Sequence, residues 1–107
     1  MNLSIKDFER YEKQIILKKI GLKGQKKIFN SKILIVGMGG LGCPLLTYLA
    51  ASGVGNLGIV DHDKVELSNL NRQTLFSIND IGSYKVNQAK NKIIKLNNKI
   101  KDRKSTR

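Results

Sequence analysis

The fold is decided by the stretch ILIVGMGGLG at residues 33–42. Its first four residues, 33–36, are all branched and apolar, a pattern typical of a strand buried on both faces in a parallel sheet. Gly37, Gly39 and Gly42 then follow with the spacing G-x-G-x-x-G. Glycines at this spacing allow a tight turn and let backbone N–H groups approach phosphate oxygens. The stretch therefore predicts a strand that leads into an anion-binding turn.

A helix and a second strand are predicted after the turn. The segment PLLTYLAAS at 44–52 has helical character up to Gly53, and the positive end of its dipole would attract an anion. The segment NLGIVD at 56–61 predicts a strand, which completes a strand-helix-strand unit with a right-handed crossover. Asp61 follows Gly42 by 19 residues, where a carboxylate can accept hydrogen bonds from ribose hydroxyls. These features indicate an α/β nucleotide-binding fold and leave NAD, FAD and ATP open.

The N-terminal residues are predicted to be helical. Ser4 and Asp7 form a helix-start signal, with the Ser4 hydroxyl able to cap a free backbone N–H group. An apolar stripe then extends the helix to about Lys19, and Gly21 is its expected stop. The stripe consists of Phe8, Tyr11, Ile15 and Ile16.

The sheet is predicted to be incomplete. A final helix is expected from Ser83 or Lys85 to Asn97, after which residues 102–107 are too polar for a third strand, although 99–101 could begin one. An open doubly wound sheet usually has about five or six strands with helices on both faces. We therefore expect a partial Rossmann-like doubly wound parallel sheet, preceded by N-terminal helices, in a chain that stops inside a larger fold and exposes apolar surface. The expected divisions are an N-terminal helical segment at 1–30, a partial nucleotide-binding domain at 31–98 and a basic polar tail at 99–107.

The charge is concentrated near the C-terminus. The net charge is +12, and residues 85–107 contribute +8 of it through nine basic residues and one acidic residue. Such a balance raises the possibility of a basic module that binds nucleic acid. However, no aromatic residue interleaves with the late lysines, so stacking on bases is poorly supported and a nucleic-acid partner is not expected.

Neither a membrane span nor a fold stabilised by disulfides or zinc is expected. The sequence has neither a long uncharged apolar run nor a secretory signal pattern, so we expect a cytoplasmic protein without a membrane partner. Cys43 is the only cysteine, which excludes an internal disulfide and a cysteine-based zinc cluster. We interpret Cys43 as a small packed residue at a helix start.

Polar residues directly after Asp61 could bind phosphate. Arg72 can make a bidentate contact with a phosphate group, and Asn69 and Gln73 can orient it. Lys85 adds a point charge at the start of the final helix. A simple dinucleotide site does not require these donors.

Four motifs resemble one known family. They are RYEKQIIL at 10–17, IVGMGGLG at 35–42, SNLNRQ at 68–73 and GSYKV at 82–86. In this order they resemble the ThiF/MoeB/HesA family, which is related to ubiquitin-activating enzymes, over roughly residues 8–98. The resemblance implies an adenylyltransferase that uses ATP and Mg²⁺ to activate the C-terminal glycine carboxylate of a ubiquitin-like sulfur-carrier protein. The product is an acyl-adenylate for sulfur transfer in molybdopterin or thiamine synthesis.

The resemblance also assigns roles to residues. Gly40, with Gly37, Gly39 and Gly42, would lie against the nucleotide, and Asp61 would bind the ribose. The phosphate path would be lined by Ser68, Asn69, Arg72 and Gln73, and Lys85 would stabilise charge on the phosphates during transfer. Lys13, in a helix that also holds Arg10 and Gln14, would complete the site of a neighbouring subunit in a homodimer.

Several family features are missing from this sequence. The further aspartate of the magnesium site, the Cys-x-x-Cys pairs of the zinc site and the surface for the ubiquitin-like partner belong to the family's later half. We therefore expect the 107-residue chain to be inactive alone. Two alternatives remain, which are an NAD- or FAD-binding fragment of an oxidoreductase and the basic nucleic-acid-binding module.

Overall fold

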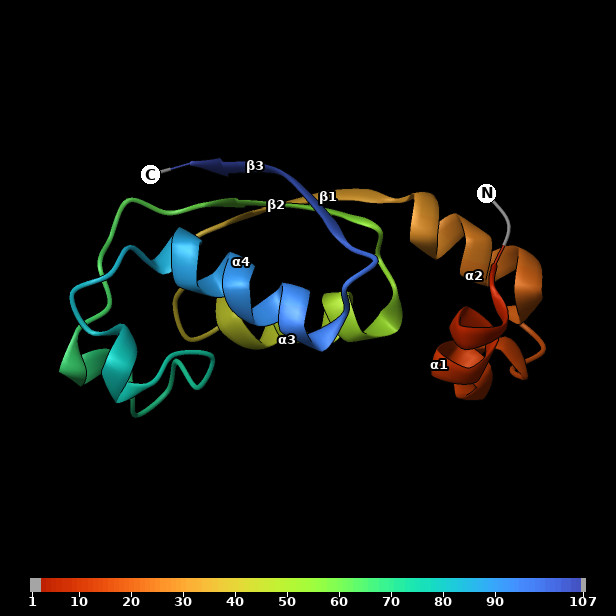
Figure 1. The fold of residues 1–107 in the computed structure, drawn as a ribbon, viewed down its shortest axis with the longest axis horizontal. Coiled ribbons are helices and arrows are strands. Elements are labelled where there is room, and N and C mark those ends of the chain that lie inside the picture. The colour runs from red at the N-terminus through yellow and green to blue at the C-terminus, as the bar shows by residue number, and fades with distance from the viewer. Residues whose placement is uncertain (1–2, 107) are drawn as a thin grey trace.

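The computed structural model describes residues 3–106, and for residues 102–106 it describes the backbone alone. The strands β1 (Lys32–Val36), β2 (Asn56–Val60) and β3 (Lys101–Thr106) form a parallel sheet in the order β1-β2-β3. The helices are α1 (Ile5–Ile15), α2 (Gly21–Asn30), α3 (Gly42–Ser52) and α4 (Lys85–Leu96). Figure 1 shows α3 and α4 on the same side of the sheet, with α1 and α2 beyond one end.

The predicted strand-helix-strand unit is confirmed. β1, α3 and β2 follow one another, and β1 pairs with β2 in parallel from Lys32↔Asn56 to Val36↔Val60. The core lies between the sheet and the two helices that cover it. Burying each large aliphatic side chain there contributes about 1.5–3 kcal/mol. Its members are Ile35, Met38, Cys43, Leu46, Ala50, Val54, Leu57, Ile59, Val65, Phe76, Val86, Ala89, Ile93 and Ile100.

The expectation that β1 is buried on both faces is wrong. Leu34 is 55% exposed and Val36 75% exposed, whereas Ile35 between them is buried. The reason is that α3 and α4 cover one face of the sheet and no described helix covers the other (Figure 1). The exposed apolar surface expected from the sequence is therefore present on the uncovered face.

The expectation that the C-terminal residues are too polar for a strand is also wrong. The backbone of Lys101–Thr106 forms β3, which pairs with β2 in parallel, with an irregularity between Leu57 and Gly58. The pairing begins where the Lys101 N–H group donates to the Gly55 carbonyl at 2.8 Å. Strand pairing uses backbone groups, and charged side chains are common on edge strands. A segment with little hydrophobicity can therefore occupy this edge.

The N-terminal helix is shorter than expected. The capping box is confirmed, since the Asp7 N–H group donates to Ser4 Oγ at 3.1 Å and the Ser4 N–H group donates to Asp7 Oδ2 at 2.9 Å. However, α1 ends at Ile15, and Gly21 begins a second helix instead of stopping the first. The second helix lies within the helical segment expected at 1–30, but its bounds were not predicted, because the polar residue Gln25 takes a buried position on the face where an apolar residue would be expected.

Side chains cap the C-terminal ends of α3 and α4. Gln14 Nε2 and Gln25 Nε2 both donate to the Ser52 carbonyl, at 2.9 and 3.0 Å. Buried Asn97 donates from Nδ2 to the Ala50 carbonyl at 3.0 Å and to the Tyr11 hydroxyl at 2.7 Å. In addition, Arg10 Nη1 donates to the Leu96 carbonyl at 2.9 Å. These bonds satisfy the Ser52 and Leu96 carbonyls at the helix ends and add a second donor to the Ala50 carbonyl, which also accepts from the Gly53 N–H group at 3.2 Å.

Within residues 3–106, no helix has the length and apolar character needed to cross a membrane.

Candidate functional site

The glycine turn joins the carboxyl end of β1 to α3, and two of its glycines are required by the chain itself. Gly37 has a φ of +95°, a backbone conformation that side chains disfavour. A β-carbon on Gly42 would collide with the Gly37 carbonyl oxygen. In contrast, a β-carbon on Gly39 would meet open space, and one on Gly40 would make only ordinary contact with Arg72. The conformation of the chain therefore does not explain the glycines at 39 and 40.

The turn presents free donors at the start of α3. Among the described residues, the N–H groups of Gly39, Gly40 and Leu41 have no acceptor, and no side chain caps the helix. Unpaired N–H groups and the positive end of a helix dipole together favour an anion. The turn therefore has the chemistry expected of a phosphate-binding segment.

Asp61 lies directly after β2, beside the glycine turn, and is half-buried. Its Oδ2 atom accepts from the Met38 N–H group and its Oδ1 atom from the Asp63 N–H group, both at 2.7 Å. Each carboxylate oxygen has two lone pairs, so both oxygens keep the capacity to accept a further bond. The ribose contact predicted from the sequence is chemically compatible with these bonds.

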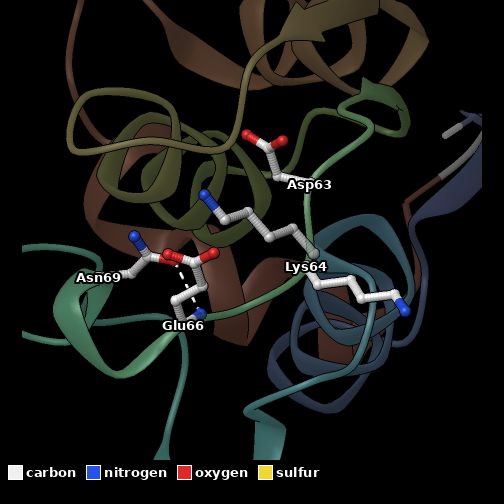
Figure 2. Close-up of a pocket in the computed structure, with 5 residues that line it drawn as sticks. Asp63, Lys64, Glu66 and Asn69 are labelled. Carbon is white, nitrogen blue, oxygen red and sulfur yellow. Dashed lines mark hydrogen bonds between the residues drawn. The ribbon is translucent and has the colours of Figure 1, made fainter.

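A polar pocket of about 160 Å³ lies next to this segment (Figure 2). It is lined by Asp63, Lys64, Glu66, Asn69 and Lys85. Lys85 is only 5% exposed, yet no carboxylate of a described residue lies within ion-pair distance of its ammonium group. A cation on a buried side chain normally has a partner, so the ammonium group of Lys85 is suited to bind an anionic group supplied from outside the chain.

Asn69 points the donor end of its amide away from the backbone. The Glu66 N–H group donates to Asn69 Oδ1 at 2.9 Å, the bond drawn in Figure 2. The amide NH₂ group of Asn69 has no acceptor among the described residues and is therefore available to donate to a ligand.

Arg72 lies against the glycine turn, since the Gly40 backbone and the aliphatic part of the Arg72 side chain are neighbours. Its Nη1 atom donates to the Ser68 carbonyl at 3.1 Å and to Asn71 Oδ1 at 3.0 Å. These bonds leave the other guanidinium N–H groups available to a ligand. The structure therefore brings Arg72 and the glycine turn together.

Other predicted residues are not brought to the pocket. Ser68 contacts Arg72 through its backbone carbonyl, and its side chain is exposed. Gln73 is buried, and its Oε1 atom has no hydrogen-bond donor among the described residues. Helix α1, which carries Lys13, lies at the end of the molecule opposite the connection between β2 and α4 (Figure 1). Within one chain, Lys13 is therefore remote from Arg72 and Lys85.

The sequence interpretation missed the pocket residues Asp63, Lys64 and Glu66 and the Arg72 partner Asn71. Their position directly after the strand that ends at Asp61 was the available signal. Charged residues in a surface loop are so common that this position alone does not distinguish them.

Cys43 is a packed thiol, as interpreted from the sequence. It is buried, and its Sγ atom contacts the Met38 carbonyl at 3.5 Å. Burial raises the pKa of the Cys43 thiol to about 11, with Lys85 opposing and Asp61 adding to the rise. The thiolate needed for nucleophilic chemistry is therefore scarce at neutral pH.

The chain is an α/β protein with a Rossmann-like parallel sheet and a glycine turn at the carboxyl end of its first strand. The ThiF family model matches residues 11–106, and the chain belongs to the ThiF family. A probable molybdopterin-synthase adenylyltransferase of Porphyra purpurea is 52% identical over 94 residues, which cover 88% of this chain and 25% of that protein. An adenylyltransferase and sulfurtransferase of Scheffersomyces stipitis is 50% identical over 97 residues, covering 90% of this chain and 22% of that protein.

Solved structures share the fold. PaaA superposes with a TM-score of 0.87 at 38% identity, covering 96% of this chain and 34% of PaaA. The structure of E. coli MccB with ATP has a TM-score of 0.83 at 29% identity, covering 98% of this chain and 39% of MccB. The chain thus spans about a quarter of the length of the curated relatives it matches and a little over a third of these structures.

Proposed function

We propose that this chain forms the ATP-binding part of an enzyme that adenylates the C-terminal glycine of a ubiquitin-like sulfur-carrier protein. The observation that carries the proposal is the buried side chain of Lys85, whose ammonium group lines a pocket and lacks an acidic partner among the described residues. A phosphate group would supply the missing counter-charge. The family membership and the adenylyltransferase relatives support ATP as the source of that phosphate.

The glycine turn supports the same ligand. Gly39 and Gly40 leave room where side chains would otherwise stand, and a nucleotide lying on the turn would use that room. Asp61 would hold the ribose, and Asn69 and Arg72 would line the path of the phosphates. An NAD- or FAD-binding fragment would need the glycines and Asp61 but not Arg72 and Lys85, so ATP is the better match.

In the proposed reaction, a carboxylate oxygen of the partner's terminal glycine attacks the α-phosphorus of ATP. The bond between the α-phosphorus and the oxygen bridging to the β-phosphate breaks, and pyrophosphate leaves with that electron pair. Arg72 and Lys85 would stabilise the charge that gathers on the phosphates, because fixed cations in a partly buried site act most strongly where charge develops. MccB, which shares this fold, has been solved with ATP and with MccA.

Magnesium would accompany ATP when it binds and would neutralise phosphate charge. Residues 3–106 contain no group of three side chains that could hold a metal ion by themselves. Mg²⁺ is usually bound by one or two carboxylates together with substrate phosphates, and Asp63 and Glu66 line the pocket with two carboxylates. A cysteine-based zinc site does not fit this chain, because Cys43 is its only cysteine.

A homodimer would place Lys13 at a second site. Since α1 is remote from the pocket of its own chain, the proposed phosphate contact of Lys13 would have to be made with the neighbouring subunit. We propose the cytoplasm as the location, as expected from the sequence. We also propose that catalysis requires parts that lie in the remaining length of the relatives.

The test is ATP binding by calorimetry with the 107-residue chain, using NAD as a competitor. The wild-type chain should bind ATP with Mg²⁺, and NAD should not displace it. Lys85→Met should weaken ATP binding at least about tenfold, since it removes one charge-assisted contact. Lys90→Met, on the exposed side of the same helix, is the matched control and should bind as the wild type does. Equal binding by both variants would overturn the proposal.

A further inference from the structure

The hydrogen-bond ladder between β1 and β2 continues past the strands through the side chain of Asp61. The Gly37 N–H group donates to the Val60 carbonyl at 2.7 Å, and the next N–H group, that of Met38, donates to Asp61 Oδ2 at 2.7 Å. Met38 is fully buried. If the carboxylate were lost, the Met38 N–H group would have poor access to water as a substitute partner. Asp61 thus fixes the first residues of the glycine turn.

The second oxygen of Asp61 holds a different segment. Oδ1 accepts from the Asp63 N–H group at 2.7 Å, and the Asp63 carbonyl accepts from the Lys85 N–H group at 3.0 Å. The isolated bridge between Lys64 and Tyr84 lies in the same place. One carboxylate therefore connects the glycine turn, the pocket residue Asp63 and the start of α4, where Lys85 stands.

We propose that Asp61 is a positioning residue that sets the spacing between the glycine turn and Lys85 before any ligand binds. This role rests on the proposed function and adds to the ribose contact, because it acts on the phosphate-binding parts of the site. Donors held in place before binding need no rearrangement when the phosphates arrive. The carboxylate is required because both of its partners are N–H donors. A carboxamide would direct its own NH₂ group at one of them.

Amide hydrogen exchange of the unliganded chain tests the positioning directly. In Asp61→Asn, the amide of Met38 or that of Asp63 should exchange about tenfold faster, because one charge-assisted bond is lost. The amides of Ile59 and Ile93 should keep their protection. Glu9→Gln, an exposed change on α1 that also removes one negative charge, should leave all four unchanged.

A second variant guards against loss of the fold. Asp61→Glu keeps the charge but moves both oxygens by one methylene, and it should show the same local acceleration. Unchanged exchange at Met38 and Asp63 in both variants would overturn the proposal. Loss of protection throughout the core in both variants would also overturn it, because it would show a general structural role.

Binding of inorganic tripolyphosphate separates positioning from ribose contact, since this probe has no ribose. If Asp61 positions the phosphate-binding groups, Asp61→Asn should weaken both tripolyphosphate and ATP by about tenfold. If it contacts only ribose, ATP binding alone should weaken, and the proposal would be wrong. If the wild-type chain binds neither probe, the proposed function fails, and the exchange measurement still decides the role of Asp61.

Discussion

The carbonyl oxygen of Gly37 lies where a β-carbon on Gly42 would stand, so the two ends of the glycine turn touch. The same is not true of Gly39, which faces open space. Gly42 is therefore required by the backbone conformation, whereas Gly39 is not. Substitution of one tests the fold, and substitution of the other tests the ligand site.

Gly42→Ala should destabilise the chain by about 2 kcal/mol or more, because the turn must open to admit the methyl group. Gly39→Ala should change stability by less than about 1 kcal/mol, since its φ is not positive and its methyl group meets nothing. However, it should weaken ATP binding about tenfold if the nucleotide lies on the turn. Chemical denaturation and calorimetry measure the two effects. Full ATP affinity in Gly39→Ala would show that the nucleotide does not use this space.

Arg72→Lys should weaken ATP binding about tenfold while leaving the free energy of unfolding nearly unchanged. Lysine keeps the charge but loses the planar group that can grip a phosphate with two bonds. The side chain is exposed, so its loss removes little packing. Arg10→Lys, on α1, is the comparison. An equal loss of affinity in both variants would show that the planar guanidinium group of Arg72 has no special role in binding ATP.

Asn97→Ala should destabilise the chain by about 1–3 kcal/mol. The substitution removes the buried donor of the Tyr11 hydroxyl and one of two donors of the Ala50 carbonyl, which keeps its bond from the Gly53 N–H group. Tyr11→Phe should cost less, because the Asn97 amide keeps its bond to Ala50. Urea denaturation with both variants measures the difference. A smaller loss for Asn97→Ala than for Tyr11→Phe would contradict this account of the network.

We expect the free energy of unfolding to decrease at acid pH, in part because Asp80 becomes protonated. Burial alone would raise the pKa of this carboxyl, but bonds from Ser77 and the nearby Lys92 ammonium outweigh it and hold the pKa below 3.8. A lowered pKa in the folded state means that the carboxylate stabilises the chain above pH 3.8, and that this contribution is lost as the pH falls through the lower value. The melting temperature of Asp80→Asn should therefore fall less than that of the wild type between pH 4 and more acid conditions. Parallel curves for the two proteins would exclude Asp80 as a source of the acid sensitivity.

Leu34→Thr with Val36→Thr should reduce self-association of the chain. Both side chains are exposed on the uncovered face of the sheet, and exposed apolar surface promotes association. Threonine keeps the strand preference of a branched residue. Light scattering over a range of concentrations measures the effect. If the wild-type chain were monomeric at all concentrations, the prediction that this face promotes self-association would be wrong.

The sequence could predict the strand-turn-helix unit because its signals are local. The apolar run at 33–36, the glycines and Asp61 each specify a conformation within a few residues. The strand β3 could not be predicted in this way, since its sequence has no apolar run and its backbone pairs with β2, which is distant in sequence. Likewise, the burial of Gln25 in α2 is accompanied by a hydrogen bond to the Ser52 carbonyl, which is distant in sequence.

For the candidate site, the sequence predicts which residues come together at one end of the sheet. The positions of Arg72 and Lys85 near the glycine turn follow from parallel strands, whose carboxyl ends meet at one edge of the sheet. The sequence could not predict which hydrogen-bonding groups of the site already have partners within the chain. The Gln73 oxygen is buried without a donor among the described residues, and Asn71 holds Arg72 through a contact that the sequence does not specify.

The capping of α3 and α4 by the N-terminal residues makes those residues part of one cooperative unit. Gln14, Gln25 and Arg10 satisfy carbonyl groups of helices whose opposite ends face the proposed site. A chain that begins at residue 31 would leave these carbonyls without their side-chain donors, and Asn97 would lose its contact with Tyr11. The boundary expected from the sequence at residue 30 therefore separates two segments of the chain that we expect to unfold together.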